Sequence, residues 1–182
     1  SVDEYEYDQA NLNLEALDKR FKNFKKIQNV FLNCFFDTTN TNELYKKLTL
    51  NDKTDFSRYH YFHASYLVSL GKNNDAKFIV KSALETYPRN LLLNQYKIDL
   101  NEKKNNYSFD CKKKEHVIAE ILYITANALA SQSIYQISNF YLNLAKYLNK
   151  SFYSYNTLLA ENFYETNNFN DAKKIYKNLS EK

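Results

Sequence analysis

Two neighbouring stretches of the chain, AEILYITANALASQSIYQISNFYLNLAKYLNK at residues 119–150 and YSYNTLLAENFYETNNFNDAKKIYKNL at residues 153–179, align with each other at a spacing of 34 residues. Small residues recur opposite small ones at the central positions, and bulky residues opposite bulky ones. The aligned pairs are Ala119 with Tyr153, Leu122 with Asn156, Ala126 with Ala160, Leu129 with Phe163, Ser138 with Ala172 and Leu142 with Tyr176. Because self-similarity at such a period marks a repeat architecture, the chain is predicted to contain stacked copies of one structural unit.

A third stretch, SRYHYFHASYLVSLGKNNDAKFIVKSALETYPRN at residues 57–90, fits the same template. Its matching positions are Ala64, Leu67, Gly71, Ala76, Val80, Ala83 and Pro88. Each copy is predicted to form two helices separated by a short break. Two antiparallel helices approach to about 8 to 10 Å only where their side chains are small. We therefore expect Ala160 and Ala172 to form the closest contact of the last copy, with Phe163 and Tyr176 filling the space beside it.

The order of residue types within each copy resembles the tetratricopeptide repeat. That family places a bulky residue, a small one and an aromatic on its first helix, and a small residue, a bulky one and a terminal Pro on its second. The resemblance implies an all-α fold, namely a right-handed α-solenoid of antiparallel helix hairpins. Departures from the pattern are His60 and His63 in the first copy, Thr125 and Ser138 in the second and Leu179 in the third.

The remaining stretches complete a division of the chain into segments. These are an N-terminal helical segment with the features of a degenerate repeat at 1–56, a repeat at 57–90, a single helix plus polar loop at 91–118, and repeats at 119–152 and 153–182. The residues of the first segment at helical spacing are Leu14, Leu17, Phe21, Phe24, Gln28 and Phe31. Thr41 is expected to be the N-cap of a following helix. The polar loop, from about Asn101 to Lys114, is expected to be mobile.

Parts of the chain such as FFDTTNTNELYKKL, residues 35–48, resemble the inner part of longer bacterial proteins of the tetratricopeptide type. The sequence also contains no Met, and we predict that it is a fragment of a longer protein. In the last copy Ile175, Tyr176 and Leu179 are apolar where a terminal repeat needs a polar outer face. This predicts either further repeats or self-association through that uncapped repeat.

The composition independently favours helices. The sequence has one Gly and one Pro in 182 residues, whereas sheets need such residues at their turns and phosphate-binding loops need several glycines. Its 25 basic and 21 acidic residues are too balanced to indicate nucleic acid or an anionic membrane as the main partner. No apolar stretch is long enough to span a bilayer, so no membrane span is expected.

The two cysteines, Cys34 and Cys111, stand alone in the sequence and match no disulfide framework. We expect a reducing compartment, and the cytoplasm is the predicted location. Cys111 precedes Lys112–Lys114, which would favour its thiolate, but no neighbouring base is identifiable. It is therefore interpreted as an incidental loop cysteine, and Cys34 as a small core residue.

The sequence contains no recognisable catalytic or metal-binding constellation. His60 and His63 share a helical face but lack a third ligand nearby, which favours core packing over metal binding. The N-terminal carboxylates, Asp3, Glu4, Glu6 and Asp8, have no apolar surroundings that would raise their pKa values for proton transfer. We therefore predict no catalytic residue, no metal site and no cofactor, and a protein that is not an enzyme.

In the tetratricopeptide family, first-helix residues that point away from the second helix line a concave groove. The resemblance therefore implies a groove that binds a peptide or a partner helix. The implied groove residues are Arg58, Tyr61, Ser65, Ser69, Glu120, Tyr123, Asn127, Ser131, Thr157, Glu161, Tyr164 and Glu165. Tyr61, Tyr123 and Tyr164 are the expected anchors, since tyrosine brings contact area at little cost in rotamer entropy. The predicted function is a non-catalytic protein–protein interaction scaffold for a protein or peptide of unknown identity.

Binding of RNA or an anionic surface is an alternative to the predicted binding of a protein or peptide. The stretch DKRFKNFKK, residues 18–26, interleaves basic residues with aromatics, as some single-strand binders do. Together with Lys112–Lys114 it would bind RNA or an anionic surface. Phe21 and Phe24 also belong to the predicted packing stripe, however, and this makes the lysines a solvated flank. The flank consists of Lys19, Lys22, Lys25 and Lys26, and nucleic acid is the less favoured partner.

Overall fold

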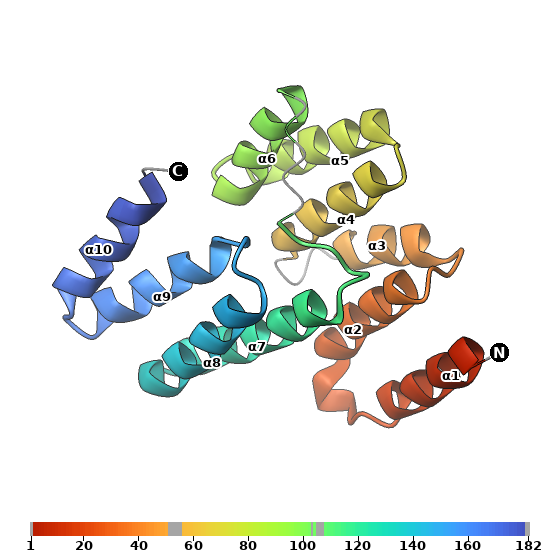
Figure 1. Ribbon diagram of the computed structural model, residues 1–182, viewed down its shortest axis with the longest axis horizontal. Helices are drawn as coiled ribbons and strands as arrows, with labels where there is room; N and C mark the ends of the chain where they lie inside the picture. The colour runs from red at the N-terminus through yellow and green to blue at the C-terminus, as the bar shows by residue number, and fades with distance from the viewer. Residues whose placement is uncertain (1, 51–55, 103, 105–107, 181–182) are drawn as a thin grey trace. The chain divides into compact units, whose positions relative to one another are not determined.

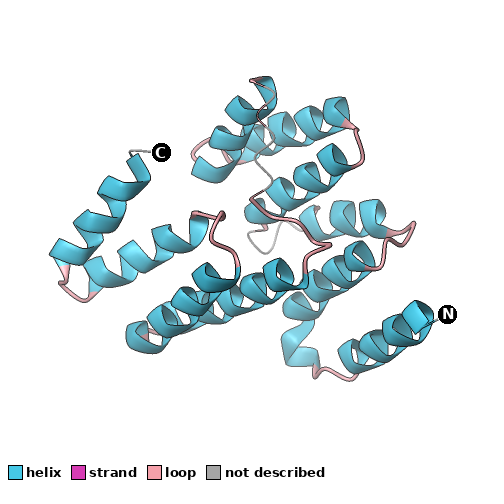
Figure 2. Cartoon of the chain, viewed as in Figure 1, coloured by secondary structure: helices cyan, strands magenta, loops and turns pink. Residues whose placement is uncertain are grey.

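The computed structural model describes residues 2–50, 56–102, 104 and 108–180, and every regular element in these ranges is a helix (Figures 1 and 2). The all-α class predicted from the composition is confirmed. Nowhere in the described ranges is a helix both long enough and apolar enough to cross a membrane.

The chain divides into two compact units, Ser1–Lys112 and Lys113–Lys182, which are described separately. The first unit contains α1 (Val2–Glu15), the 3-10 helix η1 (Lys19–Phe21), α2 (Lys22–Phe35), α3 (Thr41–Thr49), α4 (Ser57–Ser69), α5 (Asn73–Thr86) and α6 (Leu91–Asn101). The second contains α7 (Lys114–Ala130), α8 (Tyr135–Leu148), α9 (Ser154–Glu165) and α10 (Phe169–Ser180).

Within each unit, every α-helix packs against the next one along the chain. In the first unit α4 also contacts α6, and in the second α7 also contacts α9. The predicted helix pairs of residues 57–90, 119–152 and 153–182 are therefore present as α4 with α5, α7 with α8 and α9 with α10.

Four of the turns between helices share one backbone geometry. Asp37, Gly71, Ser133 and Asn167 have φ angles of 58°, 74°, 61° and 60°, in the left-handed region. At Gly71 its N–H donates to Val68 O at 2.9 Å, and the next N–H, of Lys72, donates to Leu67 O at 2.9 Å. The other three turns repeat this pair of hydrogen bonds, which defines the Schellman helix end.

The spacing of these turns extends the repeat to a region where the sequence pattern is weak. Asp37 and Gly71 are separated by the same 34 positions as Ser133 and Asn167. The hairpin of α2 and α3 therefore ends its first helix in the same way as the three hairpins recognised from the sequence. Its side chains differ from the template, and this is why only a degenerate repeat was expected there.

The small residues of the template lie in the cores of the units, as predicted. Ala64, Ala126 and Ala160 have no exposed surface, and Ala172 is 3% exposed. The prediction that Tyr176 fills the space beside Ala160 is wrong, because Tyr176 is 44% exposed. Among the described helices, α10 packs extensively only on α9, so the far side of α10 faces solvent.

A buried hydrogen-bond network explains the departure from the repeat pattern at Ser138. Asn162 of α9 donates from Nδ2 to Ser138 Oγ and to Asn139 Oδ1 of α8, each at 2.8 Å. Ser138 and Asn162 are both buried. The Ser138 hydroxyl thus accepts one of the two hydrogen bonds that the buried amide group of Asn162 donates, and a buried N–H left without an acceptor would cost roughly 1 to 3 kcal/mol.

The N-terminal segment differs from the sequence prediction in two places. The expected continuous stripe is broken after α1, where Asp18 Oδ1 accepts the Arg20 N–H at 2.8 Å and begins η1. Phe21, at the end of η1, is consequently 51% exposed instead of packed. Thr41 is not an N-cap but the first residue of α3, and its Oγ1 donates to Thr38 O at 3.0 Å.

The segment expected as a single helix plus polar loop is also different. Helix α7 begins at Lys114, so the expected boundary after residue 118 falls inside it. Phe109 and Cys111 are 3% and 6% exposed, which contradicts a solvated, mobile loop at those positions. Residues 103 and 105–107 of that loop lie outside the described part of the chain.

The close approach at Ala160 can be tested by overpacking. We expect Ala160→Leu to lower the free energy of unfolding by about 1 to 3 kcal/mol, because the added atoms have no space at the α9 contact. Ala128→Leu, on the exposed side of α7, is the control and should change it by less than about 0.5 kcal/mol. Urea denaturation measures both. Equal stability of the two variants would contradict the packing.

The shared turn geometry predicts opposite effects at two equivalent positions. An added Cβ at Gly71 meets no atom within 4 Å, so Gly71→Ala should destabilise the protein through its left-handed backbone alone, by about 1 kcal/mol. Ser133→Gly relieves the same conformational cost and should stabilise by roughly 0.5 to 1 kcal/mol. Melting temperatures that shift in the same direction for both variants would contradict the assigned turns.

Candidate functional site

A non-helical segment of the first unit lies against one face of α4. This segment, Ser108–Lys112, is called the strap. Ser65 Oγ donates a hydrogen bond to the carbonyl oxygen of Phe109 at 3.2 Å. One turn earlier on the same helix, the Tyr61 hydroxyl is hydrogen-bonded to the Ser108 hydroxyl. Successive turns of α4 therefore hold successive residues of the strap.

The ring of Phe109 anchors the strap in an aromatic cluster. Its centroid lies 4.2 Å from that of Phe62 on α4 and 5.3 Å from that of Phe31 on α2. The Arg58 guanidinium carbon lies 5.3 Å from the centroid of the Phe62 ring, within cation–π range. Burial of a phenylalanine side chain contributes roughly 1.5 to 3 kcal/mol, so Phe109 is the main non-covalent anchor of the strap.

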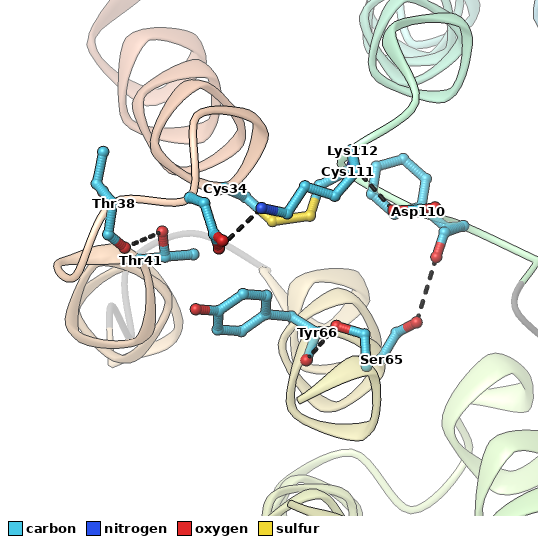
Figure 3. The surroundings of a disulfide bond; sticks show 11 residues. Cys34, Thr38, Thr41, Ser65, Tyr66, Asp110, Cys111 and Lys112 are labelled. Carbon is cyan, nitrogen blue, oxygen red and sulfur yellow. Dashed lines mark hydrogen bonds and ion pairs between the residues drawn. A yellow bond between two sulfur atoms is a disulfide. The ribbon is translucent and has the colours of Figure 1, made fainter. Parts of the chain in front are cut away.

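A disulfide joins the strap to α2 (Figure 3). It links Cys34 and Cys111, which are separated by 77 positions in sequence and whose Cα atoms are 5.9 Å apart. The expectation that these cysteines stand alone is wrong, because only the fold brings them together. Unpaired cysteines therefore no longer support a reducing compartment.

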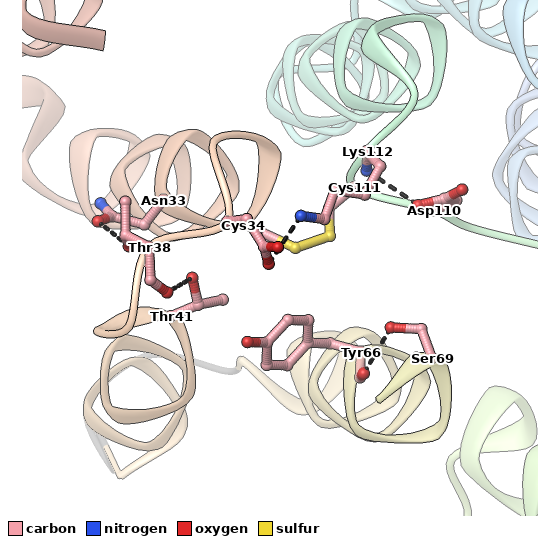
Figure 4. Close-up of polar contacts among 10 residues, drawn as sticks. Asn33, Cys34, Thr38, Thr41, Tyr66, Ser69, Asp110, Cys111 and Lys112 are labelled. Atoms are coloured by element: carbon pink, nitrogen blue, oxygen red, sulfur yellow. Dashed lines mark hydrogen bonds and ion pairs between the residues drawn. A yellow bond between two sulfur atoms is a disulfide. The ribbon is translucent and has the colours of Figure 1, made fainter. Parts of the chain in front are cut away.

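A cleft of about 400 Å³ opens between α4, α3 and the strap. Its aromatic walls come from Tyr45, Phe62, Tyr66 and Phe109, and Ser65, Ser69 and Cys111 also face it. At its edge Lys112 Nζ of the strap pairs with Asp37 Oδ1 at 2.8 Å (Figure 4). A volume of this size is within the range of specific binding sites.

The titratable groups around the strap favour binding over proton transfer. Burial raises the pKa of Tyr61 to about 12 and also raises the pKa of Tyr66 above its ordinary value. Both phenols are therefore neutral at physiological pH and act as aromatic surface and neutral hydrogen-bonding groups. The cysteine at the cleft is in a disulfide and is not a thiolate nucleophile.

The structure places the groove residues implied by the family resemblance in different surroundings. Ser65 and Ser69 line the cleft, and Arg58 and Tyr61 lie beside it on the same helix. In the second unit Glu120 is buried, Tyr123 and Thr157 are half-buried, and Asn127, Ser131, Glu161, Tyr164 and Glu165 are exposed. The prediction that Tyr61 is an accessible anchor for a partner is wrong, because its side chain is 2% exposed and its hydroxyl is hydrogen-bonded to Ser108 of the strap.

His63 is a core residue of α4. Its Nε2 lies 2.8 Å from Asn42 Oδ1, and its ring stacks on that of Tyr45 with centroids 5.1 Å apart. Burial lowers the pKa of His63 to about 4, so the ring is neutral at physiological pH. His60 is half-buried with its ring 6.1 Å from that of Tyr87. Within the described ranges no group of three His, Cys, Asp or Glu residues could hold a metal ion.

The chain matches no protein-family model, no curated protein and no solved structure. Its function is therefore inferred from its own residues.

Sequence reasoning did not identify the strap as part of the site. The stretch SFDC, residues 108–111, contains one phenylalanine and one cysteine among Asn, Lys and Asp residues. Those two apolar side chains are the buried ones, and in the sequence they were the only indication that this segment packs against the helices. Their partners on α2 and α4 lie far away in sequence, so no periodic pattern could reveal the contact.

The buried histidine predicts a specific loss of stability in acid. The unfolded chain protonates His63 near its ordinary pKa of 6.5, whereas the folded protein resists protonation down to about pH 4. Folding therefore becomes less favourable as pH falls through this window, by up to about 3 kcal/mol. Urea denaturation between about pH 7 and pH 4.5 should show a shallower decline for His63→Gln than for the wild type. His60→Gln is the control, and an equally shallow decline there would contradict the assignment to His63.

Proposed function

We propose that the protein is a non-catalytic binding scaffold, a right-handed α-solenoid of the tetratricopeptide type, which holds a peptide segment of a partner protein on the face of α4 that the strap covers. The observation that carries this proposal is that α4 already holds a peptide segment there. Ser65 captures a backbone carbonyl, and Phe62 packs against a phenylalanine ring. These are the two kinds of contact by which grooves recognise peptides, since main-chain hydrogen bonds give affinity and side-chain pockets give specificity.

The chemistry of the cleft supports binding without catalysis. Burial raises the pKa of Tyr66 in the cleft and of Tyr61 beside it, so both phenols are neutral, and the nearby His63 is buried against Asn42 and Tyr45. A general base needs a pKa near the working pH and access to its substrate.

One observation favours the alternative of binding RNA or an anionic surface. Phe21 is 51% exposed and stands between the exposed side chains of Arg20 and Lys22, with Lys19 and Lys26 also exposed. An exposed ring among cations is the arrangement on which single-stranded bases stack. Arg20 is paired with Asp18 at 3.0 Å, however, and Lys25 with Glu15 at 2.6 Å, which reduces the net positive charge of this flank.

A peptide-binding experiment tests the proposal. The protein is treated with dithiothreitol, immobilised and used to select heptapeptides from a random phage-displayed library. The selected peptides should contain an aromatic residue. Fluorescence anisotropy should give micromolar dissociation constants for their complexes with the protein. Ser69→Trp fills the cleft and should weaken binding by at least about tenfold, a loss of 1.4 kcal/mol. Ser82→Trp, at an exposed position of α5 that does not line the cleft, is the control and should leave binding within about twofold. Failure to select any peptide, or equal affinities of the two variants, would contradict the proposed site.

The dependence of binding affinity on salt concentration distinguishes the two candidate functions. Binding of a labelled oligouridine of about 20 nucleotides through the Lys19–Lys26 flank should weaken steeply between low and moderate salt, while binding of the selected peptides should change little. Tight, salt-sensitive RNA binding that Phe21→Ala abolishes would instead support the alternative.

A further inference from the structure

The strap is held on α4 in the manner of a bound ligand. It contributes a backbone carbonyl to Ser65, a hydroxyl to Tyr61 and a buried ring to Phe62. No helix or other regular element of its own holds Ser108, Phe109 or Asp110 in place. The contacts of the strap are therefore those that any peptide with a phenylalanine among polar residues would make at this face.

We infer that the strap is an intramolecular occupant of the peptide site, locked by the Cys34–Cys111 disulfide, and that reduction of this disulfide frees the site for a partner segment that presents a phenylalanine among polar residues. This inference rests on the proposed function of the α4 face. Beyond that function, the inference states that the strap blocks the site, that reduction of the disulfide opens it and that the partner must carry a phenylalanine.

The disulfide attaches the strap covalently to α2, in addition to the non-covalent contacts of Ser108 and Phe109. The Lys112–Asp37 ion pair has side chains that are 42% and 68% exposed, and pairs of this kind contribute little. The disulfide instead fixes Cys111 beside α2 and keeps the ring of Phe109 at its site. Because an attached segment competes with a free peptide at a high effective concentration, loosening this attachment raises the apparent affinity for the free peptide.

The geometry also indicates where the reaction begins. Cys34 has no exposed surface, whereas Cys111 is 6% exposed and lines the cleft. A thiolate of a dithiol reductant attacks Cys111 Sγ, the Cys34–Cys111 bond breaks, and Cys34 leaves as a thiolate that takes up a proton. The second thiol of the reductant then displaces Cys111 from the mixed disulfide. Two cysteine thiols form, and the dithiol is oxidised to its own disulfide.

The test uses a fluorescent peptide with the sequence SFDSKK, which copies residues 108–113 with serine in place of the cysteine. Fluorescence anisotropy should show that the dithiothreitol-reduced protein binds this probe at least about tenfold more tightly than the oxidised protein. Cys111→Ser should bind like the reduced protein without any reductant and should not respond to dithiothreitol. Hydrogen exchange of the strap amides should accelerate on reduction, while circular dichroism shows that the helices persist.

A second variant covers the case in which reduction unfolds the protein. Phe109→Ala, kept oxidised, empties the aromatic site while the disulfide stays intact, and it should bind the probe at least about fivefold more tightly than the oxidised wild type. Phe78→Ala is the matched control, because Phe78 on α5 is 70% exposed and touches neither the strap nor the cleft. It should bind like the wild type.

The outcomes separate this inference from the proposed function. If library-selected peptides bind the oxidised and reduced forms equally, and Ser69→Trp weakens both, the site is a peptide site but the strap does not block it, and the inference is overturned. Strap amides that stay protected after reduction overturn it as well. If no peptide binds either form, the proposed function itself fails.

Discussion

Close approach of helices at alanine is the constraint on which both units depend. Ala64, Ala126 and Ala160 have no exposed surface, and each lies on the first helix of a hairpin. Larger side chains at these positions would force the helices of a pair apart, and the packing of the neighbouring helices would be lost with them. Bulkier core residues such as Leu142 and Val80 then fill the space that this approach leaves.

The turns add a second constraint, which acts through the backbone. Each of the four Schellman ends stops one helix and redirects the chain at a residue with positive φ. Only one of these residues, Gly71, adopts this conformation without a steric cost, and Asp37, Ser133 and Asn167 retain it because the packed helices on both sides fix the direction of the chain. Glycine is therefore not required at every turn, and a chain with one glycine can still repeat the same turn.

In the first unit, these constraints fix the position of α4 between its neighbouring helices, and the strap covers part of that helix. The bond between Cys34 and Cys111 and the ring contact between Phe62 and Phe109 join segments that are distant in sequence. The strap is not helical, so its position depends on these and its other contacts with α2 and α4. The candidate site is thus a helical surface that a non-helical segment partly covers.

The sequence by itself determined the all-helical class, the three clearest hairpins and the buried small residues, because these depend on local periodicity and on side-chain size. The resemblance to the tetratricopeptide repeat also implied the groove residues Ser65 and Ser69, which line the cleft. The sequence did not determine that Phe21 is exposed, that Tyr61 is covered or that Cys34 pairs with Cys111. Only the tertiary structure decided those points, because each depends on a contact between residues whose separation in sequence follows no period.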